Sequence, residues 1–467
     1  MLTPINTIYN LLWGDLIQIP LPGGSTLGLS LLVMILIPAG IYFTVRTRFL
    51  PFRLFPEMIR ITLKSNQTVQ KGGISGLQAL IVSTACRVGM GNLVGVVAAI
   101  STGGAGAVFW MWVIALLGAS TAFIEATLSQ IYKEKDPLYG GYRGGPAYYL
   151  HALFTPKSGK RKHSIPAALF ALSGLICWCG ISQVTGNSVS SSLKNAFSIP
   201  PLYSTIFLVL IAAIIVLRKN ATVRVLDIMV PIMAACYFFF TIFVIVRNAG
   251  QLPDVLTRIF SEAFGLRQAV GGGIGAAIMN GAKRGLFSNE AGSGSAPCAA
   301  AAADIDHPAK EGLLQALGVF IDTNILCTCS AMILLLVPED LIHGLTGMDL
   351  LQAAMYYHIG EFGVVFIAVI LLLFSLSTFL GILFYARSNV AYLFGDNWLS
   401  QTLYKILALI MLFIGGMAAY QFVWDLGDVG VGLMTIFNMI ALFPLAPKAL
   451  ASLKEYESGL KKQRSGN

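Results

Sequence analysis

Apolar residues divide this chain into eleven runs, separated by loops rich in basic residues, Gly and Pro. A transmembrane α-helix needs about 20 residues, and all but the run at 203–218 reach or approach that length. The pattern therefore predicts an all-α polytopic membrane protein of about eleven helices. The predicted spans are 26–46, 75–101, 106–131, 166–193, 203–218, 224–247, 269–303, 310–337, 362–387, 401–420 and 428–448.

Two of these runs carry glycines and polar residues near their middle. Residues 286–297 read LFSNEAGSGSAP within the run at 269–303, and residues 86–95 read CRVGMGNLVG within the run at 75–101. Irregular backbone at membrane depth is tolerated only where protein buries it or where it lines a wet cavity. Both runs are therefore predicted to be broken helices that face one cavity, as in a transporter. The glycines at 271–275 are an alternative place for the second break.

The broken runs are the second and the seventh, so they are five spans apart. An odd separation reverses the direction of the chain, which indicates an inverted repeat with a discontinuous first helix in each half. One leading helix and two five-helix halves account for all eleven spans. The predicted divisions are 1–74 (amphipathic segment, leading helix and basic loop), 75–247 (first repeat), 248–448 (second repeat with its outer lead-in loop) and 449–467 (basic tail).

The composition agrees with a membrane protein, since 56% of the 467 residues are hydrophobic and 11% are charged. The net charge of +9 comes from loops, so it reflects the positive-inside rule and not nucleic-acid binding. With the N-terminus outside and the C-terminus in the cytoplasm, 24 of the 31 Lys and Arg residues lie inside. The acidic outer loop at 338–361 is predicted to carry an amphipathic helix at 348–359. The basic residues left outside are Lys194, Arg247, Arg258 and Arg267, and those within spans are Arg87, Lys283 and Arg284.

Several kinds of chemistry are excluded. No predicted span contains histidine, the cysteines lack the spacing of a zinc site, and no cofactor is implied. The first basic residue, Arg46, follows the first apolar run, so we expect no signal peptide. Without histidine in the spans or a metal site, the chain is predicted not to be an enzyme. A channel is also disfavoured, because it would need a continuous polar stripe, whereas two isolated breaks fit an occluded site better.

A set of motifs spread over nearly the whole chain resembles the alanine or glycine:cation symporter family of amino-acid transporters. That family is similar in fold to the leucine-transporter superfamily. The resemblance implies sodium-coupled import of a small neutral amino acid of the alanine and glycine class across the cell membrane by alternating access, and the residues at 90 and 382 add glutamine as a possible substrate. A proton-coupled carrier of the same fold stays open, since Glu290 or Asp322 could titrate. The motifs are GGISGLQAL (72–80), RVGMGN (87–92), GAVFWMW (106–112), RGGPAYYL (143–150), KRGLFSNEAGSGSAP (283–297) and FIDT (320–323).

The first break is predicted to bind the carboxylate of the substrate. Gly89 and Gly91 let the backbone leave the helix, and the half-helix after Asn92 directs its positive end toward the midplane. A helix contact through Gly91 and Gly95 is the alternative. A nucleotide-binding fingerprint is excluded because no strand precedes these glycines.

The second break is predicted to offer carbonyl groups to the substrate ammonium, and Ser288 to a sodium ion. Two roles for Glu290 stay open: it offsets cationic charge, or it fixes the local backbone. The resemblance places Asp322 as a sodium ligand and pairs Ser377 and Thr378 with the carbonyls near Ala85 and Val88. The alternatives are a carboxylate bonded to neighbouring helices and a hydroxyl pair bonded to backbone.

Three further residues are assigned to the substrate pocket. Gln183 and Asn187 share one helix face; the resemblance places Gln183 in the pocket, and an interhelical hydrogen bond is the alternative. Met90 and Ile382 depart from the small residue and the Trp of the family pattern, so the preferred substrate stays open. The residues predicted for substrate are Gly89, Met90, Gly91, Asn92, Gln183, Glu290, Gly292, Gly294 and Ile382, and those for sodium are Ala85, Val88, Asn92, Ser288, Asp322, Ser377 and Thr378.

Overall fold

The structure is a computed structural model that is almost entirely helical. It describes residues 3–20, 26–64, 73–87, 89–155, 163–218, 221–266, 273–342, 344–418 and 420–465. The longest unbroken helices match predicted spans, because long continuous apolar sequence favours one helix. They are α7 (Gly106–Ile131), α9 (Ile165–Phe197), α11 (Ala221–Arg247), α19 (Glu361–Phe394), α20 (Trp398–Met417) and α21 (Tyr420–Ser465).

Both predicted breaks are confirmed. The second span consists of α5 (Gly76–Arg87), the π-helical segment η1 (Gly91–Gly95) and α6 (Val96–Gly103), with a bend of 46° between its halves. The seventh span stops at the end of α13 (Ile274–Asn289) and resumes at α14 (Ala296–Ala300). The interruption therefore lies inside 286–297. Of the alternative at 271–275, Gly271 and Gly272 lie outside the described residues and α13 begins at Ile274, so that alternative stays a prediction.

The eighth span is helical throughout but changes its winding. Its first part is α15 (Pro308–Val319), its middle is the π-helical segment η3 (Phe320–Cys327), and its last part is α16 (Thr328–Leu335). Wider π-type turns occur often at functional sites because they displace the backbone from regular helix geometry. The predicted ion ligand Asp322 lies on this segment.

Shorter elements connect and cover the spans. The predicted amphipathic helix at 348–359 is confirmed as α18. The strands form two antiparallel hairpins, β1 with β2 and β3 with β4. These elements are α1 (Thr3–Trp13), β1 (Ile17–Pro20), β2 (Thr26–Leu29), α2 (Leu31–Arg46), α3 (Leu50–Arg53), α4 (Phe55–Lys64), β3 (Glu134–Lys135), β4 (Tyr142–Arg143), α8 (Pro146–Phe154), α10 (Pro201–Val216), η2 (Ala249–Gln251), α12 (Leu252–Ala263), α17 (Glu339–Ile342) and α18 (Gly347–Ile359).

By length and composition the chain crosses a membrane several times. Among the described residues, seven helices are long and apolar enough to span a bilayer, and the bent pair α5–α6 makes eight. The helices α2 and α10 are apolar but shorter. The total of eleven spans and the inverted repeat stay predictions.

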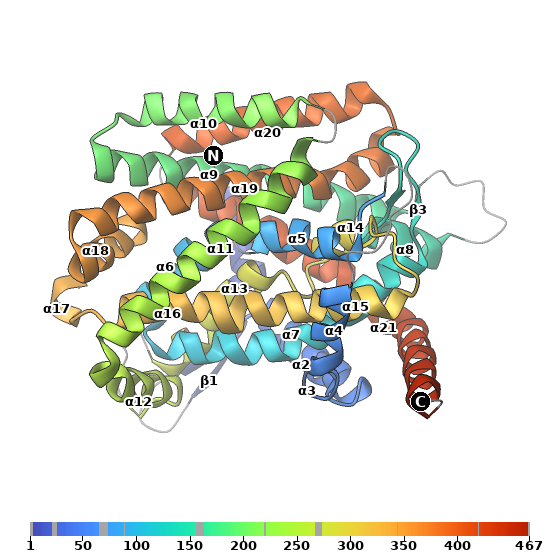
Figure 1. Cartoon of the computed structure of the whole chain (residues 1–467), viewed down its shortest axis with the longest axis horizontal. Coiled ribbons are helices and arrows are strands. Elements are labelled where there is room, and N and C mark those ends of the chain that lie inside the picture. The colour runs from blue at the N-terminus through green and yellow to red at the C-terminus, as the bar shows by residue number, and fades with distance from the viewer. Residues whose placement is uncertain are drawn as a thin grey trace.

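The long helices lie side by side in one bundle (Figure 1). The elements α12, α17 and α18 gather at one end, and β3, α8 and the C-terminal end of α21 gather at the other (Figure 1). This grouping separates the predicted outer loops from the predicted inner ones. Large apolar side chains on α10, α11 and α20 are exposed, as expected of helices that face lipid.

Candidate functional site

The second break is held open by side chains from two distant helices. Glu290 adopts a left-handed backbone (φ 56°), and Gly292 and Gly294 follow with φ of 90° and 83°. The Gly292 N–H donates to Glu125 Oε1 of α7 (3.2 Å), and Asn438 Nδ2 of α21 donates to Glu125 Oε2 (2.8 Å) and to the Gly292 carbonyl (2.9 Å). Both backbone groups of Gly292 are thus paired, as burial requires.

Four buried oxygen-bearing side chains meet where η1, α13 and η3 come together. Ser288 Oγ lies 2.9 Å from Asn92 Oδ1 and 2.7 Å from Asp322 Oδ2. Asn92 Nδ2 donates to Asp322 Oδ1 (2.7 Å), and the Thr323 hydroxyl donates to Asp322 Oδ2 (2.9 Å). Asn92, Ser288, Asp322 and Thr323 are fully buried. We refer to these four residues as the oxygen cluster.

The oxygen cluster suits a cation. A hydroxyl carries one proton, yet Ser288 Oγ is within hydrogen-bond distance of two acceptor oxygens. Ser288 can donate its proton to only one of these two oxygens. The other contact then has no Ser288 proton between its oxygens, and a cation bound among them would stabilise it. Carbonyl, hydroxyl and carboxylate oxygens are the ligands that hard cations prefer. The same contacts also fit the alternative for Asp322, in which its carboxylate only bonds to neighbouring helices. The role of Asp322 as a sodium ligand therefore stays a prediction.

The second predicted sodium group is also brought together. Ser377 Oγ of α19 lies 3.3 Å from the Ala85 carbonyl and 2.8 Å from the Phe374 carbonyl. The Met90 N–H donates to Thr378 Oγ1 (3.4 Å). The bond to Phe374 is the backbone contact given as the alternative for this hydroxyl pair. The remaining predicted member, Val88, lies outside the described residues.

Glycines allow the two breaks and α19 to approach closely. A Cβ added at Gly89 would overlap the Thr378 hydroxyl, and one added at Gly91 would reach 3.4 Å from Ser288 Cα. A Cβ at Gly95 would meet nothing within 4 Å, so Gly95 does not provide the close helix contact of the alternative interpretation. Tyr385 of α19 donates to Glu290 Oε2 (3.1 Å). This bond joins the second break to the helix that carries Ser377.

The structure places Gln183 and Asn187 against α20 and the segment that follows it. Gln183 Nε2 lies 3.2 Å from Met411 Sδ, while Gln183 Oε1 is buried without a partner in the described part of the chain. Asn187 Nδ2 donates to the Ala418 carbonyl (2.7 Å), which is the interhelical bond of the alternative interpretation. No hydrogen bond within the described ranges joins Gln183 to either break. Met90 and Ile382 are fully buried, and their role in substrate selection stays a prediction.

Sequence reasoning missed several residues of this region. Glu125 and Asn438 hold the second break, and Tyr385 contacts Glu290. Arg87 is buried at the end of α5 and donates to the Gln315 carbonyl (3.3 Å); its Nε and Nη2 have no hydrogen-bond partner among the described residues. A lone charge inside an apolar run signals function by default, and that signal would have selected Glu125 and Arg87.

Two charged residues in the second half of α13 are neutralised by Asp428 of α21. Lys283 Nζ lies 2.7 Å from Asp428 Oδ2, and Arg284 Nη1 lies 3.3 Å from Asp428 Oδ1. Trp13 of α1 donates its indole N–H to the Asp428 carbonyl (3.0 Å), and the Lys283 ammonium lies over the Tyr9 ring. The N-terminal helix therefore covers this ion pair.

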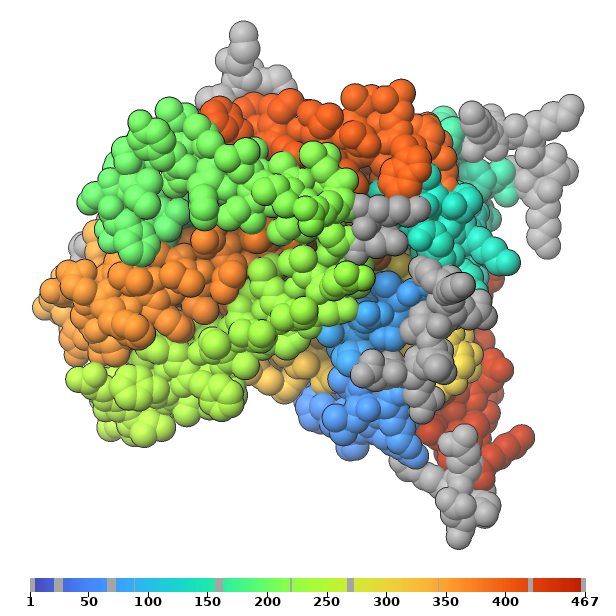
Figure 2. All heavy atoms as spheres, turned by 45° about the horizontal axis from the view of Figure 1, so that its top comes forward, coloured from blue at the N-terminus to red at the C-terminus, as the bar shows by residue number. Residues whose placement is uncertain are grey.

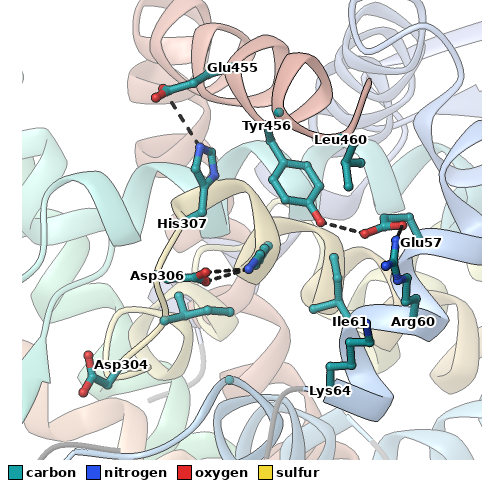
Figure 3. Close-up of a pocket in the computed structure, with 14 residues that line it drawn as sticks. Glu57, Arg60, Ile61, Lys64, Asp304, Asp306, His307, Glu455, Tyr456 and Leu460 are labelled. Atoms are coloured by element: carbon teal, nitrogen blue, oxygen red, sulfur yellow. Dashed lines mark hydrogen bonds and ion pairs between the residues drawn. The ribbon is translucent and has the colours of Figure 1, made fainter. Parts of the chain in front are cut away.

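A pocket of about 650 Å³ lies between α4, residues 304–310 and the last turns of α21 (Figure 3). Tyr456 donates to Glu57 Oε1 (2.8 Å), and His307 Nε2 lies 4.0 Å from Glu455 Oε2. Figure 3 shows these side chains directed across the pocket from the three elements. Half of its lining residues are charged and none is a predicted site residue, so it is not the site assembled at the breaks.

Comparisons with known proteins identify the family. A family model described as "Sodium:alanine symporter family" matches residues 22–467. The chain is 42% identical to the probable sodium/glutamine symporter GlnT of Bacillus subtilis over 91% of this chain and 88% of that protein. It is 33% identical to the sodium/alanine symporter AgcS of Methanococcus maripaludis over 97% of this chain and 96% of that protein.

A solved structure supports the fold. A mutant form of the Eremococcus coleocola manganese transporter aligns with a TM-score of 0.51 and 14% identity, over 86% of this chain and 80% of that one. At this identity the likeness concerns the arrangement of helices and not the substrate.

Proposed function

Because the chain belongs to the sodium:alanine symporter family, we propose that it imports a small neutral amino acid together with Na⁺ by alternating access. As a member of this family it is a multi-pass membrane transporter and not an enzyme. The proposal extends to the preferred substrate, to sodium as the coupling ion, and to a cell-membrane location with the N-terminus outside. We expect it to need no cofactor and to bind no nucleic acid.

The oxygen cluster is the observation that carries the proposal. Asn92 comes from the first broken span, Ser288 from the second, and Asp322 from η3. A cation bound there would draw three separate elements together and reduce the repulsion among their oxygens. Ion binding would then favour a compact arrangement of the two breaks, in which a substrate is enclosed.

The substrate would lie beside this cluster. Backbone N–H groups at the start of η1 suit its carboxylate, because a helix N-terminus attracts anions. Carbonyl groups at 290–294 suit its ammonium. These groups contact only the carboxylate and the ammonium, which all amino acids share. The preference for one side chain therefore depends on the apolar walls of the pocket. Relatives named as a glutamine and an alanine symporter support a small neutral substrate of either size.

Uptake into vesicles that contain the purified protein tests the proposal. Radiolabelled alanine, glycine and glutamine would be supplied with Na⁺ or with choline at one fixed pH. We expect accumulation only with Na⁺. Uptake that follows an imposed pH gradient in choline would instead support the proton-coupled carrier.

A variant of the oxygen cluster sharpens this test. Asp322→Asn keeps the shape of the side chain and removes its charge. An interaction with a charged group contributes about 1.5–3 kcal/mol. We expect the Na⁺ concentration for half-maximal uptake to rise roughly tenfold or more. Asp340→Asn, at an exposed carboxylate of α17, is the matched control. Equal half-saturation in both variants would remove Asp322 from the sodium site.

A further inference from the structure

A second pocket, of about 280 Å³, lies where the start of α5, the start of α11, the connection between β3 and β4, and the last third of α19 come together. It shares no lining residue with the larger pocket of Figure 3. Figure 2 shows α11, in yellow-green, at the surface beside blue residues from the N-terminal part of the chain. The pocket is therefore a separate feature that the proposed function has not used.

Two helices lead from this pocket to the second predicted sodium group, where Ser377 Oγ of α19 lies 3.3 Å from the Ala85 carbonyl of α5. Gln78 lines the pocket and lies seven residues before Ala85. Phe384 also lines it and lies seven residues after Ser377. Since a helix rises about 1.5 Å per residue, the pocket is about 10 Å from that contact along both helices. The basic loops before α5 and after α19 assign this direction to the cytoplasm.

One carboxylate of the pocket uses only one of its two oxygens. Asp227 Oδ2 of α11 accepts from Gln78 Nε2 (2.7 Å). Asp227 Oδ1 is buried and has no hydrogen-bond partner among the described residues. A buried acceptor without a donor is unfavourable, so this oxygen suits a donor that a ligand brings.

A basic side chain stands beside that carboxylate. Arg224 lines the pocket three residues before Asp227, and residues three apart on a helix have Cβ atoms about 5–6 Å from each other. No ion pair within the described ranges includes Arg224. The other cation of the pocket, Arg387, is already paired with Asp136 (2.8 Å) and lies over the Tyr139 ring (3.6 Å). Arg224 is therefore the cation that remains for a ligand.

These charges fit an α-amino acid, which carries an ammonium and a carboxylate on one carbon. Such a molecule bridges Asp227 and Arg224 and matches both charges. A simple anion would leave Asp227 Oδ1 without a donor, and a simple cation would leave Arg224 unmatched. Sites for drug-sized ligands measure about 300–1,000 Å³, so a pocket of about 280 Å³ suits a smaller molecule of this kind.

We propose that this pocket is a second amino-acid site, a cytoplasmic vestibule that receives the substrate after the two breaks release it. The substrate ammonium donates to Asp227 Oδ1, and its carboxylate pairs with Arg224. The inference rests on the proposed function for the source of the amino acid. Binding in the vestibule needs no Na⁺, because none of the predicted sodium ligands lines this pocket.

Saturation-transfer NMR of the purified protein, with alanine as the probe in choline buffer without Na⁺, tests the vestibule apart from transport. We expect a weak alanine signal from the wild type. Asp227→Asn keeps an acceptor for Gln78 and removes the charge, so the affinity for alanine should fall roughly tenfold or more. Arg224→Gln, at the exposed end of the pocket, should lower it about two- to fivefold.

Matched variants separate a binding site from a structural contact. Arg218→Gln removes an exposed charge just before α11 that does not line the pocket, and it should bind alanine like the wild type. Gln78→Leu breaks the bond to Asp227 but keeps the carboxylate, so it should also retain binding. An equal loss in Gln78→Leu and Asp227→Asn would mean that the bond only holds α5 against α11, and the proposed site would be wrong.

Two smaller probes test the zwitterion, since propionate and ethylamine each keep one charge of alanine. Both should give weaker signals than alanine. A propionate signal equal to that of alanine would reduce the pocket to an anion contact and contradict the proposal. An alanine signal that appears only with Na⁺ would leave the proposed function standing and would show that the vestibule is not an amino-acid site.

Discussion

Two hydroxyl groups in the middle of α19 contact the backbone at the end of α5 and at the first break. Ser377 Oγ lies between the carbonyls of Ala85 and Phe374, and Thr378 Oγ1 accepts from Met90. A hydroxyl group in this position can form a hydrogen bond with the backbone or can coordinate an ion. Only measurement of ion dependence separates these roles.

Ser377→Ala with Thr378→Ala should weaken sodium dependence more than amino-acid recognition at saturating Na⁺. Loss of two neutral ligands, at about 1 kcal/mol each, predicts a rise of roughly tenfold or more in the Na⁺ half-saturation. Uptake at varied Na⁺ measures it. Ser375→Ala, a buried hydroxyl two residues away on the same helix, is the control. A double variant that matches this control would mean that the hydroxyls bond only backbone.

Residues 90 and 382 should set the size of the substrate. Met at 90 is flexible and should reshape the side-chain end of the pocket, and Ile at 382 has less volume than the Trp of the family pattern. One methylene in an apolar pocket is worth about 1–3 kcal/mol, so close homologues can be reordered. Ile382→Trp should shift preference toward alanine and glycine and away from glutamine.

Competition uptake across glycine, alanine, serine, valine and glutamine measures that shift. Because Ile382 is fully buried, the larger side chain also strains its surroundings; a thermal unfolding curve separates lost folding from changed selectivity. An unchanged ranking in a folded variant would exclude residue 382 from the pocket.

At the scale of elements, the second break is a built feature and not a local loss of helix. Its left-handed glycines are packed against other spans: a Cβ at Gly294 would lie 2.6 Å from Pro146 Cγ and 2.9 Å from Phe170 Cε2. The bonds from Glu125 and Asn438 fix the same stretch. Precise placement of the break therefore depends on several other helices.

Gly294→Ala should destabilise the protein by about 2 kcal/mol or more, since it combines an unfavourable φ with a clash against rigid side chains. Gly95→Ala is the matched control, because its φ of −65° is helical and the added Cβ meets nothing within 4 Å. Thermal unfolding in detergent should show a clear loss only for Gly294→Ala. Equal melting temperatures would mean that the break tolerates other backbone conformations.

At the scale of the whole molecule, the bundle has two chemically distinct ends. One end carries α12, α17 and α18, and the other carries β3, α8 and the end of α21 (Figure 1). Basic residues are concentrated in the loops that belong to the second end. The positive-inside rule assigns that end to the cytoplasm.

A reporter enzyme or fluorescent protein fused after Asn467 should therefore be active only in the cytoplasm. The same reporter inserted in the acidic loop that carries α17 is the control. It should be inactive there, because that loop is predicted to lie outside. Periplasmic activity of the C-terminal fusion would overturn the charge argument and, with it, the proposed direction of the inverted repeat.

The sequence by itself determined most of the long helices and the position of the first break, and it favoured 286–297 over 271–275 for the second. Span length and apolarity are local properties, so runs such as 106–131 and 362–387 predicted α7 and most of α19. The glycines at 89, 91, 292 and 294 marked irregular backbone because they tolerate conformations that other residues avoid. The two breaks indicated Asn92 and Ser288 as sodium ligands, the resemblance added Asp322, and the structure places the three in contact.

The tertiary structure alone decided which side chains from distant spans meet. Glu125 and Asn438 are 313 residues apart, yet together they fix the second break. Gln183 has a polar side chain like the pocket residues, but its amide lies against Met411 of α20. An apolar run specifies a helix and not its rotation or its neighbours. Those depend on how all the helices pack at once, because packing, and not local sequence, selects which face of each span turns inward.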